Sequence, residues 1–291
     1  MRVTDLYAKK TPVVSMEFFP PRDEAAAEAF DAIVDTLANR SPDYLSVTFG
    51  AGGSNRDGSY QTVKNLIKEK ELPSVAYIAG YGLGPDDITG VLDHYRALGV
   101  ETIFVIRGDQ PRDETFSPHP ESFSYASDLI GFIRERYDFT IGCAGYPEGH
   151  VEAESIDTDI RYLKKKQDNG AQYVVAQYCY DNRVFFNYVE KCQAAGVTVP
   201  IIPGIMPVYT VKLTNILSKV CGAAITPALQ DKLDAVKDAD KETVVQTGID
   251  FAVNQCRDLL KQGVPGLHFY TMNRSKSTSE IVDRLKEEGL L

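Results

Sequence analysis

The stretch VVSMEFFPPR, residues 13–22, is an apolar run that contains β-branched and aromatic residues and ends in two prolines. This composition predicts a buried strand, and the prolines predict that the strand stops by Phe19. An open dinucleotide-binding sheet would instead place a G-x-G-x-x-G turn after its first strand. Because Pro20 and Pro21 occupy that place, the stretch disfavours such a sheet.

Seven further apolar, β-rich runs follow this stretch along the chain. They are YLSVTFG (44–50), SVAYIAG (74–80), TIFVIRG (102–108), TIGCAGY (140–146), YVVAQYCY (173–180), PIIPGIM (200–206) and GLHFYTM (266–272). Segments with helical spacing lie between the runs. For example, PDDITGVLDHYRALG (85–99) starts with acidic residues and stops at a glycine, as helix dipoles and C-caps favour.

Eight near-continuous apolar runs, each followed by a helix, are typical of parallel strands whose two faces are covered. The alternation therefore predicts an α/β fold, a single (βα)8 TIM-type barrel over residues 1–291. The connection from residue 207 to 264 departs from the pattern because it holds TVKLTNILSKVCG, TPALQDKLDAV and ETVVQTGIDFAVNQCRDLLKQG. We therefore expect an extra helix or helices after the seventh strand.

Composition narrows the classes of function. Hydrophobic residues make up 43% of the 291 residues and charged residues 25%, as in ordinary globular proteins. The net charge of −10 and the dispersed basic residues argue against a surface for nucleic acid or an anionic membrane. The five cysteines are odd in number and include no C-x-x-C pair, which argues against a disulfide framework and a Cys-based zinc site. No apolar leader or long apolar run is present, so we expect a cytoplasmic protein that binds small molecules.

In a barrel of this type, active-site residues lie at the carboxyl ends of the strands, and Glu17 is at such a position in the first run. One interpretation is structural: the carboxylate binds loop amides or pairs with Arg22. The other interpretation is a general acid, which apolar neighbours such as Phe18 and Phe19 keep protonated near neutral pH. The residues alone leave both interpretations open.

Two further strand ends carry polar residues that can bind a ligand. In IRGDQP, Arg107 and Asp109 could neutralise each other in a tight turn, or they could flank a ligand that approaches closely at Gly108. Gln177 could be a satisfied core amide, or it could bind the edge of a heterocycle, because an amide both donates and accepts hydrogen bonds.

The segments SMEFFPPR, SVTFGAGGS, IRGDQP, YASDL, YPEGH, AQY, IIPGIMP and HFYTMNR occur in an order that closely resembles the methylenetetrahydrofolate reductases. The resemblance runs from about residue 13 to 275. It implies non-covalent FAD and a ping-pong reaction. A reduced nicotinamide, NADH or NADPH, gives hydride to the flavin, and 5,10-methylenetetrahydrofolate then takes the hydride and becomes 5-methyltetrahydrofolate. It also implies a homo-oligomer, and because the chain stops at Leu291 we expect no regulatory domain.

The resemblance also implies roles for residues. Glu17 matches the general acid, and Asp109 matches a carboxylate near the flavin and the pterin. Substrate-binding positions match Asp109, Gln177, Tyr270 and Arg274. Flavin-binding positions match Thr48, Phe49, Ala51, Tyr77, Arg107, Gly108, Asp109, Tyr125, Ala126, Tyr146, His150, Ala153, Asp159, Tyr162, Lys165 and Lys166.

Some positions depart from the family pattern. Tyr77 begins a Tyr-Ile-Ala segment where His-Leu-Thr is expected, Tyr162 and Lys165 stand where Asn and Arg are expected, and Leu213 replaces a Gln. These departures bear on the affinity for flavin and folate, so a non-catalytic or altered-specificity flavin- and folate-binding barrel is one alternative. A barrel lyase is another, but a Schiff-base lysine at a strand end would be needed and none of the eight runs contains one.

Overall fold

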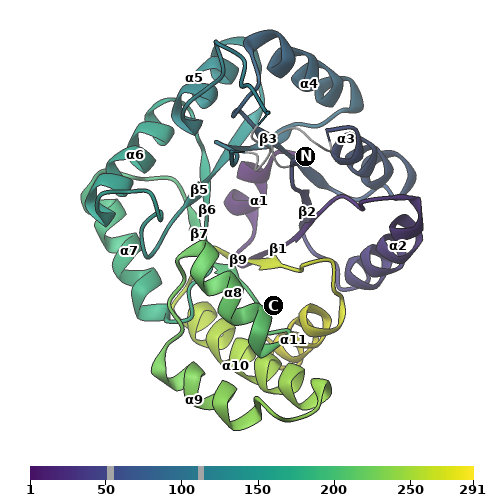
Figure 1. The fold of residues 1–291 in the computed structure, drawn as a ribbon, viewed down its shortest axis with the longest axis vertical. Coiled ribbons are helices and arrows are strands. Elements are labelled where there is room, and N and C mark those ends of the chain that lie inside the picture. Colours follow the sequence, from purple (N-terminus) through teal and green to yellow (C-terminus); the bar gives the residue numbers. More distant parts are fainter. Residues whose placement is uncertain (51–55, 111–114) are drawn as a thin grey trace.

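The chain folds as a parallel β-barrel surrounded by helices (Figure 1). The computed structural model describes residues 1–50, 56–110 and 115–291. Nine parallel strands form within those residues: β1 (Val13–Phe18), β2 (Tyr44–Val47), β3 (Ser74–Ala79), β4 (Thr102–Ile106), β5 (Thr140–Gly145), β6 (Tyr173–Ala176), β7 (Ile201–Ile202), β8 (Gly204–Ile205) and β9 (Gly266–Tyr270). Their order in the sheet is β7-β6-β5-β4-β3-β2-β1-β9-β8.

Strands β7 and β8 are two halves of one barrel position. Pro203 separates them, and a proline has no N–H to donate to a strand ladder. β7 pairs with β6 while β8 pairs with β9, so the two halves together join the two edges of the sheet. The carbonyl of Pro203 accepts a hydrogen bond from the amide of His268 at 3.1 Å. The predicted (βα)8 barrel is confirmed, with an interrupted seventh strand.

Helices cover the outside of the barrel. They are α2 (Glu24–Ala38), α3 (Arg56–Lys64) with a π-helical continuation (Asn65–Glu69), α4 (Pro85–Leu98), α5 (Ala126–Arg136), α6 (Ile156–Asp168), α7 (Asn182–Ala194) and α11 (Lys276–Glu287). The side chains of Asp23 and Ser155 cap α2 and α6, and α4 ends at Gly99 with a φ of 86°. No helix in the described residues is both long and apolar enough to cross a membrane.

A short helix that the sequence did not indicate, α1 (Val3–Lys9), closes the amino-terminal end of the barrel. The amide of Val3 donates to Thr102 Oγ1 at 3.1 Å, and Val3 belongs to the main hydrophobic core. The ring centroid of Tyr7 lies 6.3 Å from that of Tyr173 on β6. The hydroxyl of Tyr7 is 3.4 Å from that of Tyr44 on β2. This end of the barrel is therefore packed with side chains.

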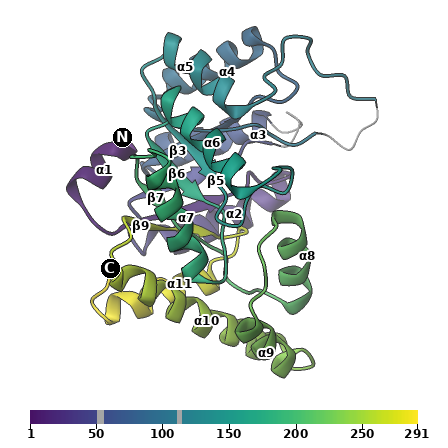
Figure 2. The ribbon, with the colours of Figure 1, turned by 90° about the vertical axis from the view of Figure 1, so that its left-hand side faces the viewer.

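The connection between β8 and β9, described throughout, contains three helices, α8 (Val211–Cys221), α9 (Pro227–Val236) and α10 (Lys241–Lys261). Helix α10 packs against α11 and completes the outer layer. Helix α8 lies on the opposite side of the barrel from α1 (Figure 2). It begins where Thr210 Oγ1 accepts from the amide of Leu213 at 3.0 Å, and it ends at Gly222, with a φ of 71°. The expected extra helices after the seventh strand are confirmed.

Candidate active site

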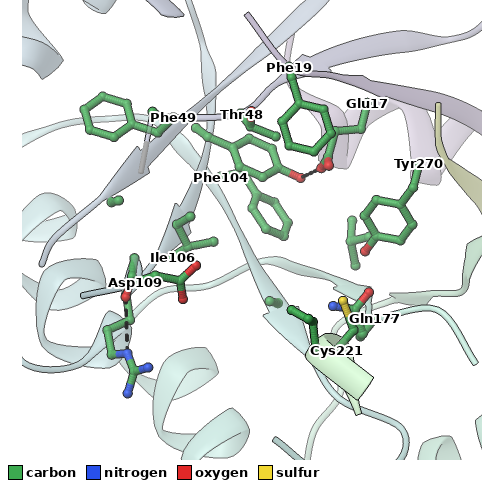
Figure 3. A pocket seen from close by; sticks show the side chains of 18 of the residues that line it. Glu17, Phe19, Thr48, Phe49, Phe104, Ile106, Asp109, Gln177, Cys221 and Tyr270 are labelled. Atoms are coloured by element: carbon green, nitrogen blue, oxygen red, sulfur yellow. Dashed lines mark hydrogen bonds between the residues drawn. The ribbon is translucent and has the colours of Figure 1, made fainter. Parts of the chain in front are cut away.

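The carboxyl ends of the strands surround a cavity of about 650 Å³ (Figure 3). All strands of the barrel are parallel, so residues that are far apart in the sequence meet at this end. The side chains of α8 complete the wall opposite β1. The sequence-predicted residues that line the cavity are Glu17, Thr48, Phe49, Tyr77, Arg107, Gly108, Asp109, Tyr146, His150, Gln177 and Tyr270.

Glu17 lies on the inner face of β1 and is 6% exposed. The hydroxyl of Tyr77 on β3 donates a hydrogen bond of 2.6 Å to Glu17 Oε2. His268 Nε2 on β9 lies 3.5 Å from the same oxygen, and His268 Nδ1 is 2.8 Å from the hydroxyl of Ser15. Thr271 Oγ1 donates to the Glu17 carbonyl at 2.6 Å, which fixes the backbone. The carboxyl is therefore buried and held in place, and Arg22 is not its hydrogen-bond partner among the described residues.

The surroundings of Glu17 differ from the sequence interpretation. Phe18 points to the opposite face of β1, where its ring packs edge-on against Phe30 of α2 at 5.8 Å. Phe19 lines the cavity but is 42% exposed. The buried aromatic ring next to Glu17 is that of Tyr77, which stacks on Phe104 at 4.4 Å. The expectation that Phe18 encloses the carboxyl is wrong, because adjacent residues of a strand face opposite sides.

The turn after β4 places Arg107 and Asp109 at the rim of the cavity. Arg107 forms an ion pair with Glu152 rather than with Asp109, so the self-neutralised turn is wrong. Gly108 has a φ of 87°, and a Cβ there would lie 2.9 Å from the Cβ of Ala79. The backbone and its packing on β3 therefore require glycine at this position, whatever ligand the cavity holds.

A smaller cavity of about 150 Å³ adjoins the first and shares Arg107, Tyr146 and His150 with it. Asp159 and Lys166 of α6 both line it, as expected for two residues seven apart on one helix face. Lys166 Nζ donates to the carbonyl of Ala144 at 2.9 Å. The other sequence-predicted residues that line the smaller cavity are Tyr125, Ala126, Ala153 and Tyr162.

Burial controls the ionisation of three groups where the cavities meet. It raises the pKa of Asp159, although Lys166 and His150 act in the opposite direction. Burial lowers the pKa of His150, and the neighbouring charge of Arg107 lowers it further. Burial also raises the pKa of Tyr146, whose ring lies edge-on to His150 at 4.7 Å. Near neutral pH this region therefore combines a neutral imidazole and a neutral phenol with the cations Arg107 and Lys166.

Comparisons with known proteins give the family. The model of the methylenetetrahydrofolate reductase family matches residues 2–286. The chain belongs to the methylenetetrahydrofolate reductase family. It is 33% identical over 272 residues to the 5,10-methylenetetrahydrofolate reductase of Escherichia coli K12, covering 94% of this chain and 90% of that protein.

The chain is also 35% identical over 286 residues to methylenetetrahydrofolate reductase 1 of Schizosaccharomyces pombe, covering 97% of this chain. It spans 47% of that relative, or about half its length. Among solved structures, a Clostridium thermocellum protein that binds two copies of 5-methyl-5,6,7,8-tetrahydrofolic acid aligns with a TM-score of 0.67 over 98% of both chains. At 14% identity that likeness shows the fold alone.

A few residues that family resemblance singles out line neither cavity. Lys165 points outward from α6 and pairs with Asp128 of α5 at 2.9 Å. Arg274 lies over the ring of Tyr209, 5.1 Å from its centroid. Leu213 is in the first turn of α8 and lines neither cavity. Ala51 lies outside the described residues. Sequence resemblance to the family therefore selects segments that line the two cavities, but it does not show which side chains reach them.

The structure adds residues that the sequence analysis did not select. Phe104 of β4 is the stacking partner of Tyr77, and Glu152 is the ion-pair partner of Arg107. Val220 and Cys221 line the larger cavity from the last turn of α8. Phe104 could have been selected from the inward-facing positions of its strand, because it lies two residues before Ile106. The other three depend on how the connections after β5 and β8 fold back over the barrel, which no local pattern indicates.

Proposed function

We propose that this barrel reduces 5,10-methylenetetrahydrofolate to 5-methyltetrahydrofolate with FAD and a reduced nicotinamide, and that Glu17 is the general acid. The observation that carries the proposal is a buried carboxyl, 6% exposed, on the wall of a 650 Å³ cavity at the carboxyl end of the barrel. Membership of the methylenetetrahydrofolate reductase family supports it.

The residues around the smaller cavity fit a dinucleotide. Arg107 and Lys166 offer two cations for phosphate oxygens, and Asp159 offers a carboxylate for a ribose hydroxyl. The neighbouring larger cavity has room for a planar ring system between Thr48, Ile106 and Ala144. We infer that FAD binds across both cavities and, when bound, carries hydride from the nicotinamide to the folate.

In the proposed reaction, the protein supplies one proton. The Glu17 carboxyl, in its protonated form, gives it to a bridging nitrogen of the folate, the bond from that nitrogen to the methylene carbon breaks, and the carbon becomes an iminium that can accept hydride. Glu17 is left as a carboxylate. Because the carboxyl is 6% exposed, water has little access to this proton once ligands fill the cavity.

Gln177 is suited to bind the edge of a heterocycle in the larger cavity. Its Oε1 accepts a hydrogen bond from the amide of Tyr178 at 3.1 Å, which orients the side chain. No hydrogen bond within the described part of the chain uses the Nε2 donors, which leaves them for an acceptor on the ligand. The same amide could serve the pterin and the nicotinamide if these two ligands occupy the cavity in turn. Asp109 is exposed at the rim, where it could accept a hydrogen bond from the pterin.

The two half-reactions test this function separately. Purified protein should take up FAD, and the flavin absorbance should bleach anaerobically with NADH or NADPH. Replacing Glu17 by Gln should slow reoxidation by methylenetetrahydrofolate by roughly 100- to 10,000-fold, the usual range for loss of a general acid. The nicotinamide half-reaction should change little, because it needs no proton from Glu17.

A matched control is Glu148→Gln. Glu148 lies on the loop after β5, where its carboxylate accepts hydrogen bonds from the amide of Ala224 at 3.0 and 3.1 Å, and it lines neither cavity. This variant should retain both half-reactions. Protein that takes up no FAD would refute the proposal, and equal loss of both half-reactions in Glu17→Gln would refute the role of Glu17. Flavin uptake and bleaching without folate turnover would support the non-catalytic binder instead.

A further inference from the structure

Tyr77 makes a close side-chain contact with Glu17 on the cavity wall. Its hydroxyl donates to Glu17 Oε2 at 2.6 Å, and this bond is drawn at the Glu17 carboxyl in Figure 3. Both residues are 6% exposed. The tyrosine ring stacks on Phe104 with centroids 4.4 Å apart and planes 22° apart. The hydroxyl therefore has little freedom to turn away from the carboxyl.

The direction of the hydrogen bond is fixed by chemistry. Burial raises the pKa of the Tyr77 phenol well above its ordinary value, and a carboxylate at Glu17 raises it further whenever Glu17 is ionised. Tyr77 therefore keeps its proton across the pH range in which proteins work, and it can always donate. A hydrogen bond donated to a carboxyl group favours the ionised form, and it does so more strongly where water is excluded.

The hydrogen bond from Tyr77 also determines which carboxyl oxygen of Glu17 is available to give a proton to a ligand. Tyr77 and His268 both approach Oε2, at 2.6 and 3.5 Å. No hydrogen bond from the described residues reaches Oε1. With Oε2 occupied by Tyr77, Oε1 is the oxygen left to carry a proton toward a ligand in the cavity.

We propose that Tyr77 is a positioning residue for the general acid: it holds Glu17 Oε2, directs Oε1 to the substrate, and stabilises the carboxylate that forms when the proton leaves. The inference rests on the proposed function. In the proton step, the O–H bond of the Glu17 carboxyl breaks and an N–H bond forms on the folate. The proton of Tyr77 does not transfer, and its hydrogen bond shortens onto the new carboxylate.

Other ionisable groups also interact electrostatically with Glu17. They are His268 and Tyr270 from β9 and Tyr44 from β2, besides Tyr77 from β3. The first test therefore observes the carboxyl itself. Infrared difference spectra of the ligand-free protein, with Glu17→Gln as the blank, report the C=O band of the protonated acid against pH. In Tyr77→Phe the band should persist to higher pH, by about one unit for a loss of about 1.4 kcal/mol.

The second test is kinetic. Tyr77→Phe should slow the folate half-reaction roughly 10- to 100-fold, because it removes a hydrogen bond to a charged group. The alkaline limb of the pH profile of this variant should move to higher pH, by the same amount as the pH at which the infrared band disappears. Flavin reduction by nicotinamide, measured on the same variant, reports any separate effect of Tyr77 on the flavin. A structural role alone would change protein yield and melting temperature without moving the pH profile.

Two comparisons make the outcome decisive. Tyr137→Phe is a matched control, because Tyr137 also donates to a carboxylate, Asp93 Oδ1 at 3.0 Å, on the outer helices. That variant should behave as wild type in both tests. In a Glu17→Gln background, Tyr77→Phe should slow the folate half-reaction no further. The role of Tyr77 would be overturned if the infrared band disappeared at the same pH in Tyr77→Phe as in the wild type. It would also be overturned if Tyr77→Phe slowed the folate half-reaction as much in the Glu17→Gln background as in the wild type.

These outcomes are separate from those for the proposed function. If the wild-type protein binds no FAD or reduces no folate, the proposed function fails, and the infrared band still measures the effect of Tyr77 on Glu17. If folate reduction is present and depends on Glu17 while Tyr77→Phe leaves the band and the rates unchanged, only the inference about Tyr77 fails.

Discussion

The two ends of the barrel interior are formed by the same strands and filled in opposite ways. At the amino-terminal end, Tyr44 and Tyr173 are fully buried and meet Tyr7 of α1. Gly142 leaves room for the ring of Tyr173, because a Cβ at this glycine would lie 2.2 Å from the ring. At the carboxyl end the same strands line a cavity of about 650 Å³.

This difference indicates that one end of the barrel stabilises the fold and the other end binds ligands. Large aromatic side chains at one end bury apolar area and stabilise the fold. At the other end, small or polar inward-facing residues such as Thr48, Ala144 and Gln177 leave space for ligands. We therefore expect substitutions at the amino-terminal end to change stability more than ligand binding, and substitutions around the cavities to do the reverse.

The largest expected effect is that of Tyr173→Ala. Tyr173 is 0% exposed and its ring contacts those of Tyr7 and Phe104. Removing the ring should lower the free energy of unfolding by about 3–5 kcal/mol, as large-to-small changes in a core do. Urea unfolding, followed by circular dichroism, measures this.

Two controls sharpen that measurement. Tyr173→Phe should cost little, because the Tyr173 hydroxyl is buried without a hydrogen-bond partner among the described residues. Phe19→Ala at the cavity should lower stability by less than about 1 kcal/mol, because its ring is 42% exposed. Equal losses in Tyr173→Ala and Phe19→Ala would break the distinction between the two ends.

The next largest effect concerns flavin binding and Lys166. This side chain is half-buried, lines the smaller cavity near Asp159, and donates to the Ala144 carbonyl. Lys166→Met keeps most of the chain and removes the charge, so FAD should bind roughly 10- to 100-fold more weakly if Lys166 contacts a phosphate. Quenching of flavin fluorescence gives the dissociation constant. A variant with wild-type affinity would place the phosphates elsewhere.

Much of the fold could be predicted from the sequence, because its signals are local. Apolar runs, acidic helix starts and glycine stops each depend on a few neighbouring residues, and they correctly predicted the barrel and α4. Helix α1 was not predicted because it has seven residues and its N-cap residue, Arg2, makes no side-chain capping bond. Its stability comes from tertiary contacts of Val3 and Tyr7.

The candidate site could be predicted less completely. The segments that meet at the barrel mouth follow from the rule that barrel sites form at strand ends. The hydrogen-bond and ion-pair partners within the site do not follow from this rule, because Tyr77 lies 60 residues from Glu17 and Glu152 lies 45 residues from Arg107. Phe18 shows why sequence neighbours mislead: the next residue on a strand faces the other side of the sheet.

A smaller effect, on the pH dependence of the free energy of unfolding, is expected from His150. Its Nδ1 accepts a hydrogen bond from the amide of Glu152 at 3.2 Å, which requires the unprotonated nitrogen. Burial and Arg107 lower its pKa in the folded protein below the ordinary value of about 6.5. Between these two values the unfolded chain binds more protons, so stability should fall as the pH drops below about 6.5.

The free energy of unfolding that His150 contributes, and that is lost at low pH, should be less than about 1 kcal/mol, because the side chain is half-buried and solvent screens its charge. Urea unfolding at pH values from 5 to 7.5, compared with His150→Gln, isolates the contribution. The variant should show a flatter dependence in this window. Parallel curves for the two proteins would show that His150 does not contribute.

The smallest effect is expected for Lys165→Met, although the sequence predicted a flavin contact there. Lys165 is adjacent to Lys166 in the sequence, but on a helix the two side chains point in different directions. Its ammonium is exposed and pairs with Asp128, which is 44% exposed. Such surface pairs contribute about 0–1 kcal/mol. FAD affinity should therefore change by less than about twofold, because neither residue of this pair lines a cavity. A loss as large as that of Lys166→Met would mean that α6 turns a different face to the flavin than the structure shows.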